Sequence, residues 1–224
     1  VERTRSLNEA EKKLKISLDE KITLLNEIHH RVKNNLAVVI ALLDLQRMRN
    51  ADPNIRRVLD DAKSRIKSMG FVHETLYQTE DFANVEFSEY LKRLCKSLET
   101  TLKAPNKDIS ILYECEKMSL PIEKAIPLGL LINEVIVNSY KHAFKELNKG
   151  TVSLSLKKSE QDYYLIIKDN GVGFSNLEKP SKTSKSLGMK LIKTLTNQLK
   201  GTLDLQSKYG DTSFRLQFSL DKKP

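Results

Sequence analysis

The segment EIHHRVKNNL, residues 27–36, places a carboxylate and an amide about one helical turn to either side of two possible nucleophiles. Two adjacent histidines lie between a carboxylate, Glu27, and an amide, Asn34. Neutral imidazole is a nucleophile near pH 7. Glu27 could hold the Nδ1 proton of a histidine and leave Nε2 free to attack, while Asn34 could position a water. Taken alone, the segment also fits two solvated surface histidines.

Helical phase separates His29 from His30. No proline or glycine interrupts residues 1–49, and apolar residues at 3–4 spacing predict one long helix there. The apolar residues form two rows: Leu18, Leu25, Val32 and Val39, and Leu7, Leu14, Ile28 and Leu42. With Ile28 and Val32 facing inward, His30 points about 200° away from each, because each residue turns the helix by about 100°. His30 is therefore the predicted nucleophile, and His29 lies nearer the apolar seam.

A second group of polar residues occupies a predicted helix over residues 122–144. Glu134, Asn138 and Lys141 have i, i+4, i+7 spacing and share one face. Asparagine is unfavourable in mid-helix, so its presence there calls for a reason. An amide oxygen can bind Mg²⁺ and a lysine can bind phosphate, which would supply one. An ordinary solvated face is the alternative.

Glycine-containing turns supply the third group. DNGVGF, residues 169–174, follows an apolar strand, and a carboxylate at Asp169 could accept a hydrogen bond from an adenine amino group. Gly171 and Gly173 would let the backbone approach a flat ring or a phosphate. Gly188 opens a predicted helix after the polar loop 175–186, where backbone N–H groups suit phosphate.

The elements that must position these groups predict an α+β protein. Asp52-Pro53 is a helix-start signal, and a second helix from this point predicts an antiparallel helical hairpin over the first 80 residues. The hairpin cannot bury both apolar stripes alone, so we expect a symmetric dimer that forms a four-helix bundle. Residues from about 85 onward are predicted as an α+β unit. Its predicted helices are 88–103, 122–144 and 187–200, and its predicted strands are 109–114, 152–157, 164–168, 202–206 and 213–220.

Composition excludes several classes of protein. The chain is 39% hydrophobic, and no apolar run approaches the roughly 18–20 residues that span a bilayer. Its two cysteines match neither a zinc motif nor a disulfide framework, which favours a cytoplasmic location. The 38 basic and 29 acidic residues give a net charge of +9, but the excess is scattered and no nucleic-acid motif occurs. No nucleic-acid partner is expected.

The order of these motifs resembles that of the sensor histidine kinases of two-component systems. The resemblance is carried by HRVKN, NEVIVNSYKHAF and DNGVGF, and it covers the chain from about residue 26 onward. It is strongest to the subgroup whose phosphoacceptor box reads His-Arg-x-Lys-Asn. It implies a dimerisation and phosphoacceptor hairpin, residues 1–80, followed by a gyrase-like ATP-binding domain, residues 85–224. The implied fold of this domain is an α/β sandwich with ATP under a lid.

The resemblance also implies roles for individual residues. His30 would accept phosphate from ATP and pass it to an aspartate of a response regulator receiver domain. Asn138 would bind Mg²⁺ and Lys141 a phosphate, and Asp169 would bind adenine. The nucleotide-box glycines would be Gly171, Gly173 and Gly188. The implied cofactors are ATP and Mg²⁺, and the implied partners are a second copy of the chain, a receiver domain and an upstream sensor domain, because the chain begins in mid-helix.

Two departures from the family pattern leave alternatives open. Arg31 follows His30 where the common box has an acid, which makes Glu27 the substitute candidate for the base. Glu134 lies four residues before Asn138, as in hydrolytic gyrase-like ATPases, and could ligate metal or act on a water. The alternatives are therefore a gyrase-like ATPase or protein serine kinase with Glu134 as base, or a degenerate, non-catalytic docking module.

Overall fold

The computed structural model describes residues 2–76, 84–173 and 187–220. The chain forms two compact units, Val1–Glu74 and Thr75–Pro224. Among the described helices, none is both long enough and apolar enough to cross a membrane.

The first unit is a hairpin of two helices, α1 (Glu2–Arg49) and α2 (Pro53–Leu76). The predicted helix over residues 1–49 is confirmed, and α2 begins at the predicted proline. Asp52 caps α2, because its Oδ1 accepts a hydrogen bond from the backbone N–H of Asn54 at 2.8 Å. Pro53 suits the first helical position, where its missing N–H costs nothing.

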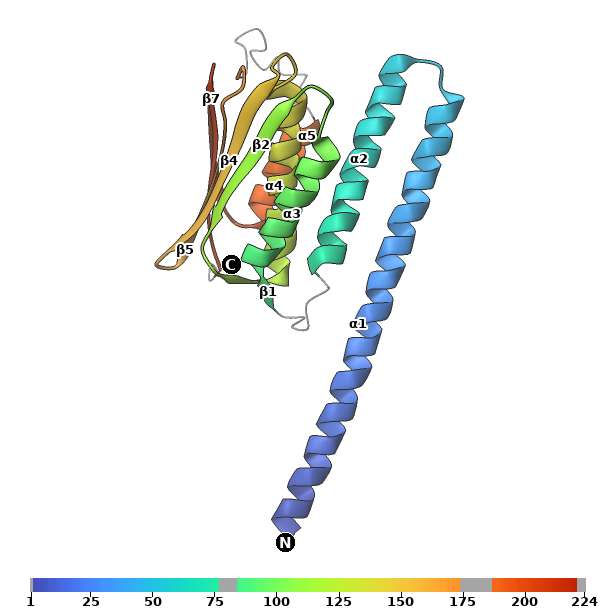
Figure 1. The fold of residues 1–224 in the computed structure, drawn as a ribbon. Coiled ribbons are helices and arrows are strands. Elements are labelled where there is room, and N and C mark those ends of the chain that lie inside the picture. Colours follow the sequence, from blue (N-terminus) through green and yellow to red (C-terminus); the bar gives the residue numbers. More distant parts are fainter. Residues whose placement is uncertain (1, 77–83, 174–186, 221–224) are drawn as a thin grey trace. The chain divides into compact units, whose positions relative to one another are not determined.

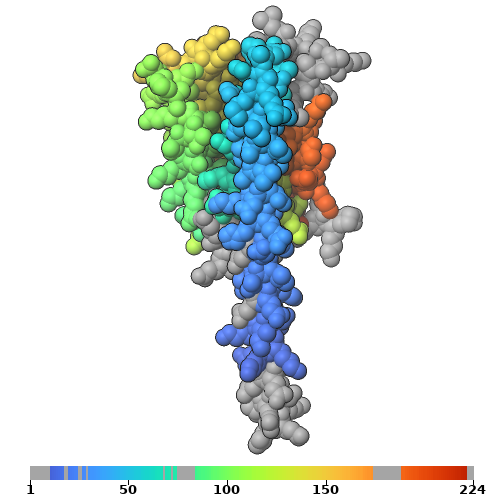
Figure 2. Space-filling view, turned by 90° about the vertical axis from the view of Figure 1, so that its right-hand side faces the viewer, coloured from blue at the N-terminus to red at the C-terminus, as the bar shows by residue number. Residues whose placement is uncertain are grey.

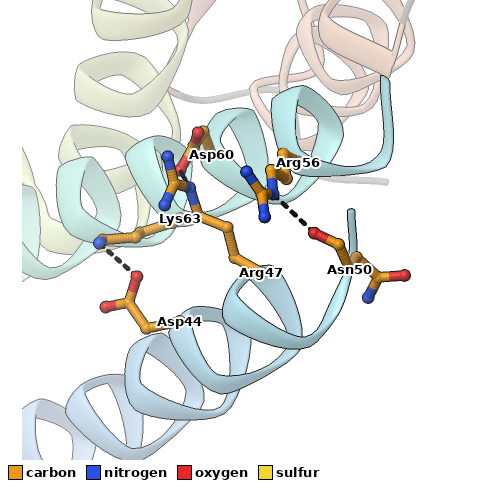
Figure 3. A network of polar contacts seen from close by, with 6 residues as sticks. All are labelled: Asp44, Arg47, Asn50, Arg56, Asp60 and Lys63. Atoms are coloured by element: carbon orange, nitrogen blue, oxygen red, sulfur yellow. Dashed lines mark hydrogen bonds and ion pairs between the residues drawn. The ribbon is translucent and has the colours of Figure 1, made fainter. Parts of the chain in front are cut away.

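Polar contacts close the loop end of the hairpin (Figure 3). They are Lys63 Nζ to Asp44 Oδ1 at 2.5 Å, Arg47 Nε to Asp60 Oδ1 at 2.7 Å, and Arg56 Nε to the Asn50 carbonyl at 2.6 Å. Further along, Lys33 pairs with Glu74 at 2.7 Å. Ion pairs at a surface contribute about 0–1 kcal/mol each, so these contacts fix the register of α1 against α2 more than they stabilise it.

Much of the apolar surface of the hairpin stays exposed in the single chain. Leu42 is 55% exposed and Val58 63% exposed. Leu14, Ile28 and Val39, which belong to the predicted apolar rows, are exposed as well. In Figure 2 the described part of α1 is turned toward the viewer. Pairing of α1 with α2 therefore covers only part of the apolar pattern.

The second unit is a five-stranded sheet covered on one face by α3 (Phe87–Leu102), α4 (Ile122–Asn138) and α5 (Leu187–Gln198) (Figure 1). The strand order is β2-β4-β5-β7-β6, with β2 parallel to β4 and the other pairs antiparallel. The strands are β2 (Asp108–Cys115), β4 (Lys149–Ser159), β5 (Asp162–Asp169), β6 (Thr202–Lys208) and β7 (Asp211–Ser219). The predicted α+β class and all five predicted strands are confirmed.

Alternation of side chains places the core between sheet and helices. In β5, Tyr163, Leu165 and Ile167 are buried while the residues between them are not. The same period of two occurs in β4 and β7, and it directs one face of the sheet toward the apolar faces of α3, α4 and α5. The carboxyl end of β5 therefore reaches the helical layer with Asp169.

Two features differ from the sequence prediction. A small antiparallel sheet joins β1 (Asn84–Glu86) to β3 (Ser119–Pro121), and strands of three residues are too short to show an alternating pattern. The helix predicted over residues 122–144 ends its α-helical part at Asn138. It continues as one π-helical turn, η1 (Ser139–Ala143), in which the N–H of Phe144 bonds the Ser139 carbonyl at 3.1 Å.

Tyr90 generates a stability prediction. Its side chain is 3% exposed, and its hydroxyl has no hydrogen-bond partner among the described residues. We expect Tyr90→Phe to raise the free energy of unfolding by about 1 kcal/mol, because an unpaired buried hydroxyl is costly. Urea unfolding followed by circular dichroism measures this.

Gly129→Ala is the matched comparison, since a Cβ there would collide with the Tyr90 ring and hydroxyl. It should destabilise the wild-type protein. A Tyr90→Phe variant that unfolds at a lower urea concentration than the wild type would show instead that the hydroxyl is paired.

Candidate functional site

A cavity opens where the end of α4 and the η1 turn face the ends of β5 and β7 and the start of α5. It is lined by Asn138, Ser139, His142, Ala143, Asp169, Gly173, Met189, Thr212 and Phe214. Three residues that the sequence selected for binding chemistry, Asn138, Asp169 and Gly173, thus meet in one place although 35 positions separate the first from the last. The strand β5 and the helix α4 bring them together.

Asp169 is the buried anion of this cavity. It is the last residue of β5, and only 5% of its surface is exposed. The Ser139 hydroxyl donates to its Oδ2 at 2.8 Å, and the Gly171 N–H donates to its Oδ1 at 3.1 Å. Burial raises the pKa of Asp169 above the ordinary carboxyl value, while hydrogen bonds from Ser139, Gly171 and Thr212 act in the opposite direction.

This arrangement suits recognition of a flat, nitrogen-rich ring. A carboxylate that is held in place by protein donors still has lone pairs for an incoming N–H group. Ala143, Met189 and Phe214 give the same cavity an apolar lining. A few placed polar groups within apolar walls are typical of small-molecule sites.

The two glycines after Asp169 are required for different physical reasons. Gly171 packs so closely on η1 that a Cβ would lie 2.5 Å from the Cβ of Ala143. Gly173 has a φ of +72°, in the left-handed region that favours glycine. The N–H of Val172 donates to the Ala143 carbonyl at 3.0 Å, and the N–H of Gly210 donates to the Gly171 carbonyl at 2.8 Å. This loop is therefore fixed between η1 and the β6–β7 hairpin.

The remaining selected residues of the second unit lie outside the cavity lining. Glu134 is 2% exposed on α4, one turn before Asn138. Lys141 is exposed on η1. Gly188 is buried at the start of α5, directly before Met189, which does line the cavity. The predicted lid, residues 175–186, lies outside the described residues.

Ser139 and Thr212 are functional candidates that sequence reasoning missed. Both are buried polar residues whose side chains hold Asp169. Ser139 directly follows Asn138 and its hydroxyl also lies 3.3 Å from the Val135 carbonyl, so helix spacing alone predicts only a hydrogen bond within its own helix. Thr212 lies two residues after Gly210 in the β6–β7 turn. A hydroxyl residue this close to a glycine turn was the sequence feature that could have marked it as a site residue.

The selected residues of the first unit share the surface of α1. His30 and Asn34 are exposed, as the helical phase predicts for His30. Glu27 contacts Arg31, whose Nε donates to Glu27 Oε1 at 2.9 Å. Both side chains of this pair are more than half exposed. Within the described residues, the carboxylate thus pairs with the guanidinium, and its assignment as base for His30 stays a prediction.

Comparison with protein families matches both units. Residues 27–102 match the family described as histidine kinase, and residues 123–222 match the family described as histidine kinase-, DNA gyrase B- and HSP90-like ATPase. The second match implies ATP as the nucleotide.

Individual relatives agree. The chain is 30% identical over 195 residues to the sensor histidine kinase PdtaS of Mycobacterium tuberculosis, covering 85% of this chain and 38% of the relative. It is 25% identical to blue-light-activated histidine kinase 2 of Erythrobacter litoralis, covering 81% of this chain and 52% of the relative. The chain thus spans about two fifths to one half of the length of these relatives.

Solved structures share the fold. A blue-light activated histidine kinase of Erythrobacter litoralis aligns with a TM-score of 0.67 at 20% identity, over 89% of this chain and 59% of that one. The histidine kinase domain of the same protein aligns with a TM-score of 0.64 at 18% identity, over 84% and 97%. The two family matches and the PdtaS relative confirm the resemblance drawn from the motifs: the chain belongs to the sensor histidine kinase family.

Proposed function

We propose that this chain is the catalytic core of a dimeric histidine kinase, which phosphorylates itself on His30 from ATP and passes the phosphoryl group to an aspartate of a receiver domain. The observation that carries the proposal is the buried Asp169, held by three donors in an apolar cavity of the ATPase-family unit. The exposed histidine in the segment matched to the histidine kinase family supports it.

In this proposal Asp169 accepts a hydrogen bond from the exocyclic amino group of adenine. Asn138 lies on the cavity wall, where its amide oxygen suits a hard cation such as Mg²⁺. Bound Mg²⁺ would neutralise charge on the phosphates. Lys141 is exposed and long enough to reach a phosphate beyond the cavity, and the start of α5 at Gly188 would present backbone N–H groups.

The chemical step is an in-line displacement at the γ-phosphorus. The Nε2–P bond forms while the bond to the bridging oxygen breaks, and ADP leaves with that oxygen's charge. A hydrogen-bond acceptor for the Nδ1 proton would stabilise the imidazolium product. Glu27 can take this role if it leaves Arg31, and an exposed pair of this kind is worth only about 0–1 kcal/mol.

The surface of the first unit supports the proposed partners. Exposed apolar residues on α1 and α2 leave an unburied stripe that a second copy would cover, giving the four-helix bundle. A receiver domain would approach the same helix to reach His30. A sensor domain would act through the amino-terminal end of α1. The chemistry requires cytoplasmic ATP, and we place the chain there.

The gyrase-like ATPase or serine kinase alternative is less well supported. It requires Glu134 as a base open to water or substrate, yet Glu134 is buried outside the cavity lining. A non-catalytic docking module would not need the donors that hold Asp169.

Phosphate chemistry tests the proposal. Incubation with [γ-³²P]ATP should label the chain with phosphate that is stable in base and labile in acid, as expected of phosphohistidine. His30→Gln should abolish the label, because amide nitrogen is not a nucleophile. His29→Gln is the matched control and should keep it. Label that persists in His30→Gln and vanishes in His29→Gln would contradict the assignment.

Asp169→Asn tests the nucleotide site, and in a separate measurement it tests the stability of the nucleotide-free protein. We expect ADP affinity, measured by calorimetry, to fall about 10- to 100-fold, because a hydrogen bond to a charged group is worth about 1.5–3 kcal/mol. An unchanged ADP affinity would exclude Asp169 from the site.

The same variant should change the pH dependence of stability in the absence of nucleotide. The raised pKa of Asp169 means that folding favours its protonated form, so wild-type stability is lost as the pH rises through that pKa. Asparagine does not titrate. The stability of Asp169→Asn relative to wild type should therefore increase from about pH 4, near the ordinary carboxyl pKa, toward neutral pH. Urea unfolding at both pH values measures it.

The dimer is tested separately. Leu42→Asp places a charge in the exposed apolar row of α1 and should convert a dimer to a monomer in light scattering after size-exclusion chromatography. Asn197→Asp introduces the same charge at an exposed polar position of α5, in the second unit, and should leave the mass unchanged. Equal masses for all three proteins would reject this stripe as the interface.

A further inference from the structure

The π-helical turn η1 has one side that faces the nucleotide cavity. There Ser139 donates to Asp169, and the Ala143 carbonyl accepts the N–H of Val172 at 3.0 Å. The Cβ of Ala143 also supports Gly171 at close range. The exact path of this turn therefore decides where the carboxylate and the glycine loop lie.

The other side of η1 is attached to the edge of the sheet. Lys107, one residue before β2, donates from Nζ to the carbonyls of Phe144 at 2.5 Å and Lys145 at 2.8 Å. The Tyr140 hydroxyl donates to the Ile109 carbonyl of β2 at 3.2 Å. Lys107, Tyr140 and Ile109 are not among the residues that line the cavity.

A π-helical turn needs such support. It is rare in proteins because it accommodates one more residue than an α-helical turn. The carbonyls at the end of a helix also have no partner within the helix. The Lys107 ammonium group supplies two charge-assisted hydrogen bonds at this point, which are stronger than neutral ones.

Loss of this support has a defined geometric consequence. If the turn relaxed to α-helical register, the residues after it would rotate by about 100° around the helix axis. The Ala143 carbonyl would then point away from Val172, and the loop that follows Asp169 would lose its hydrogen bond to η1.

We propose that Lys107 is a positioning residue for the nucleotide site: it fixes the exit of the η1 turn, and the turn holds the loop from Asp169 to Gly173 in its binding conformation. The inference rests on the proposed function for its effect on nucleotide binding. Its effect on the loop is a property of the nucleotide-free protein and is measurable on its own.

Lys107→Met in the full chain tests the proposal, because methionine keeps most of the apolar stem and removes the donors. Hydrogen exchange of the Val172 amide in the nucleotide-free protein should become about 10-fold faster, since its acceptor is displaced. ADP affinity by calorimetry should fall about 5- to 10-fold. In autophosphorylation, the KM for ATP should rise while kcat at saturating ATP stays within about twofold, as expected when ground-state binding alone is weakened.

Two further variants separate positioning from general stability. Lys103→Met removes a cation from the same shallow groove beside Lys107 and should match the wild type in all three measurements. Lys107→Arg retains two donors and should restore much of the ADP affinity. If Lys107→Met does not fold, Tyr140→Phe removes the other anchor of η1 and should change the same measurements in the same direction.

The possible failures are distinguishable. Wild-type protein that does not bind ADP would contradict the proposed function. Wild-type protein that binds ADP, with Val172 exchange and ADP affinity in Lys107→Met equal to those in Lys103→Met, would overturn the role of Lys107. A uniform increase in exchange over the whole second unit, without a specific effect at residues 170–173, would also overturn it.

Discussion

The second unit depends on the cost of burying one carboxylate. Asp169 lies at the end of a strand inside an apolar layer, and burial there disfavours its charge. Ser139, Gly171 and Thr212 offset that cost, and each comes from a different element. The helix, the glycine loop and the last strand are therefore constrained at a single point. An amino group of a ligand would add the next donor to the same anion.

The η1 turn positions the groups that contact Asp169 and the loop after it. A regular α-helix after Asn138 would direct the Ala143 carbonyl away from the loop that follows Asp169. The turn is less favourable than an α-helical one, and its outer side is held by Lys107 and Tyr140. The η1 turn therefore contacts the edge of the sheet on one side and lines the cavity on the other.

The first unit follows a different rule. Its two helices are joined by a capped loop and ion pairs, which set the register at little gain in stability. Its apolar residues exceed what a two-helix hairpin can cover, and several remain exposed. A histidine on the polar surface of such a helix is accessible to large partners. The candidate site of the second unit depends on a buried carboxylate, Asp169. That of the first unit depends on an exposed histidine, His30.

The sequence by itself determined the main helices and strands, the family and most residues of the candidate site. Periodicity fixes which face of a helix or strand is apolar, and spacing therefore placed His30 outward and put Asp169 at a strand end. Tertiary structure alone decided the π-helical turn, the short β1–β3 sheet, and the contacts that Ser139, Thr212 and Lys107 make. These features depend on contacts between residues far apart in the chain or on a departure from regular helix geometry. Local patterns carry no information about either.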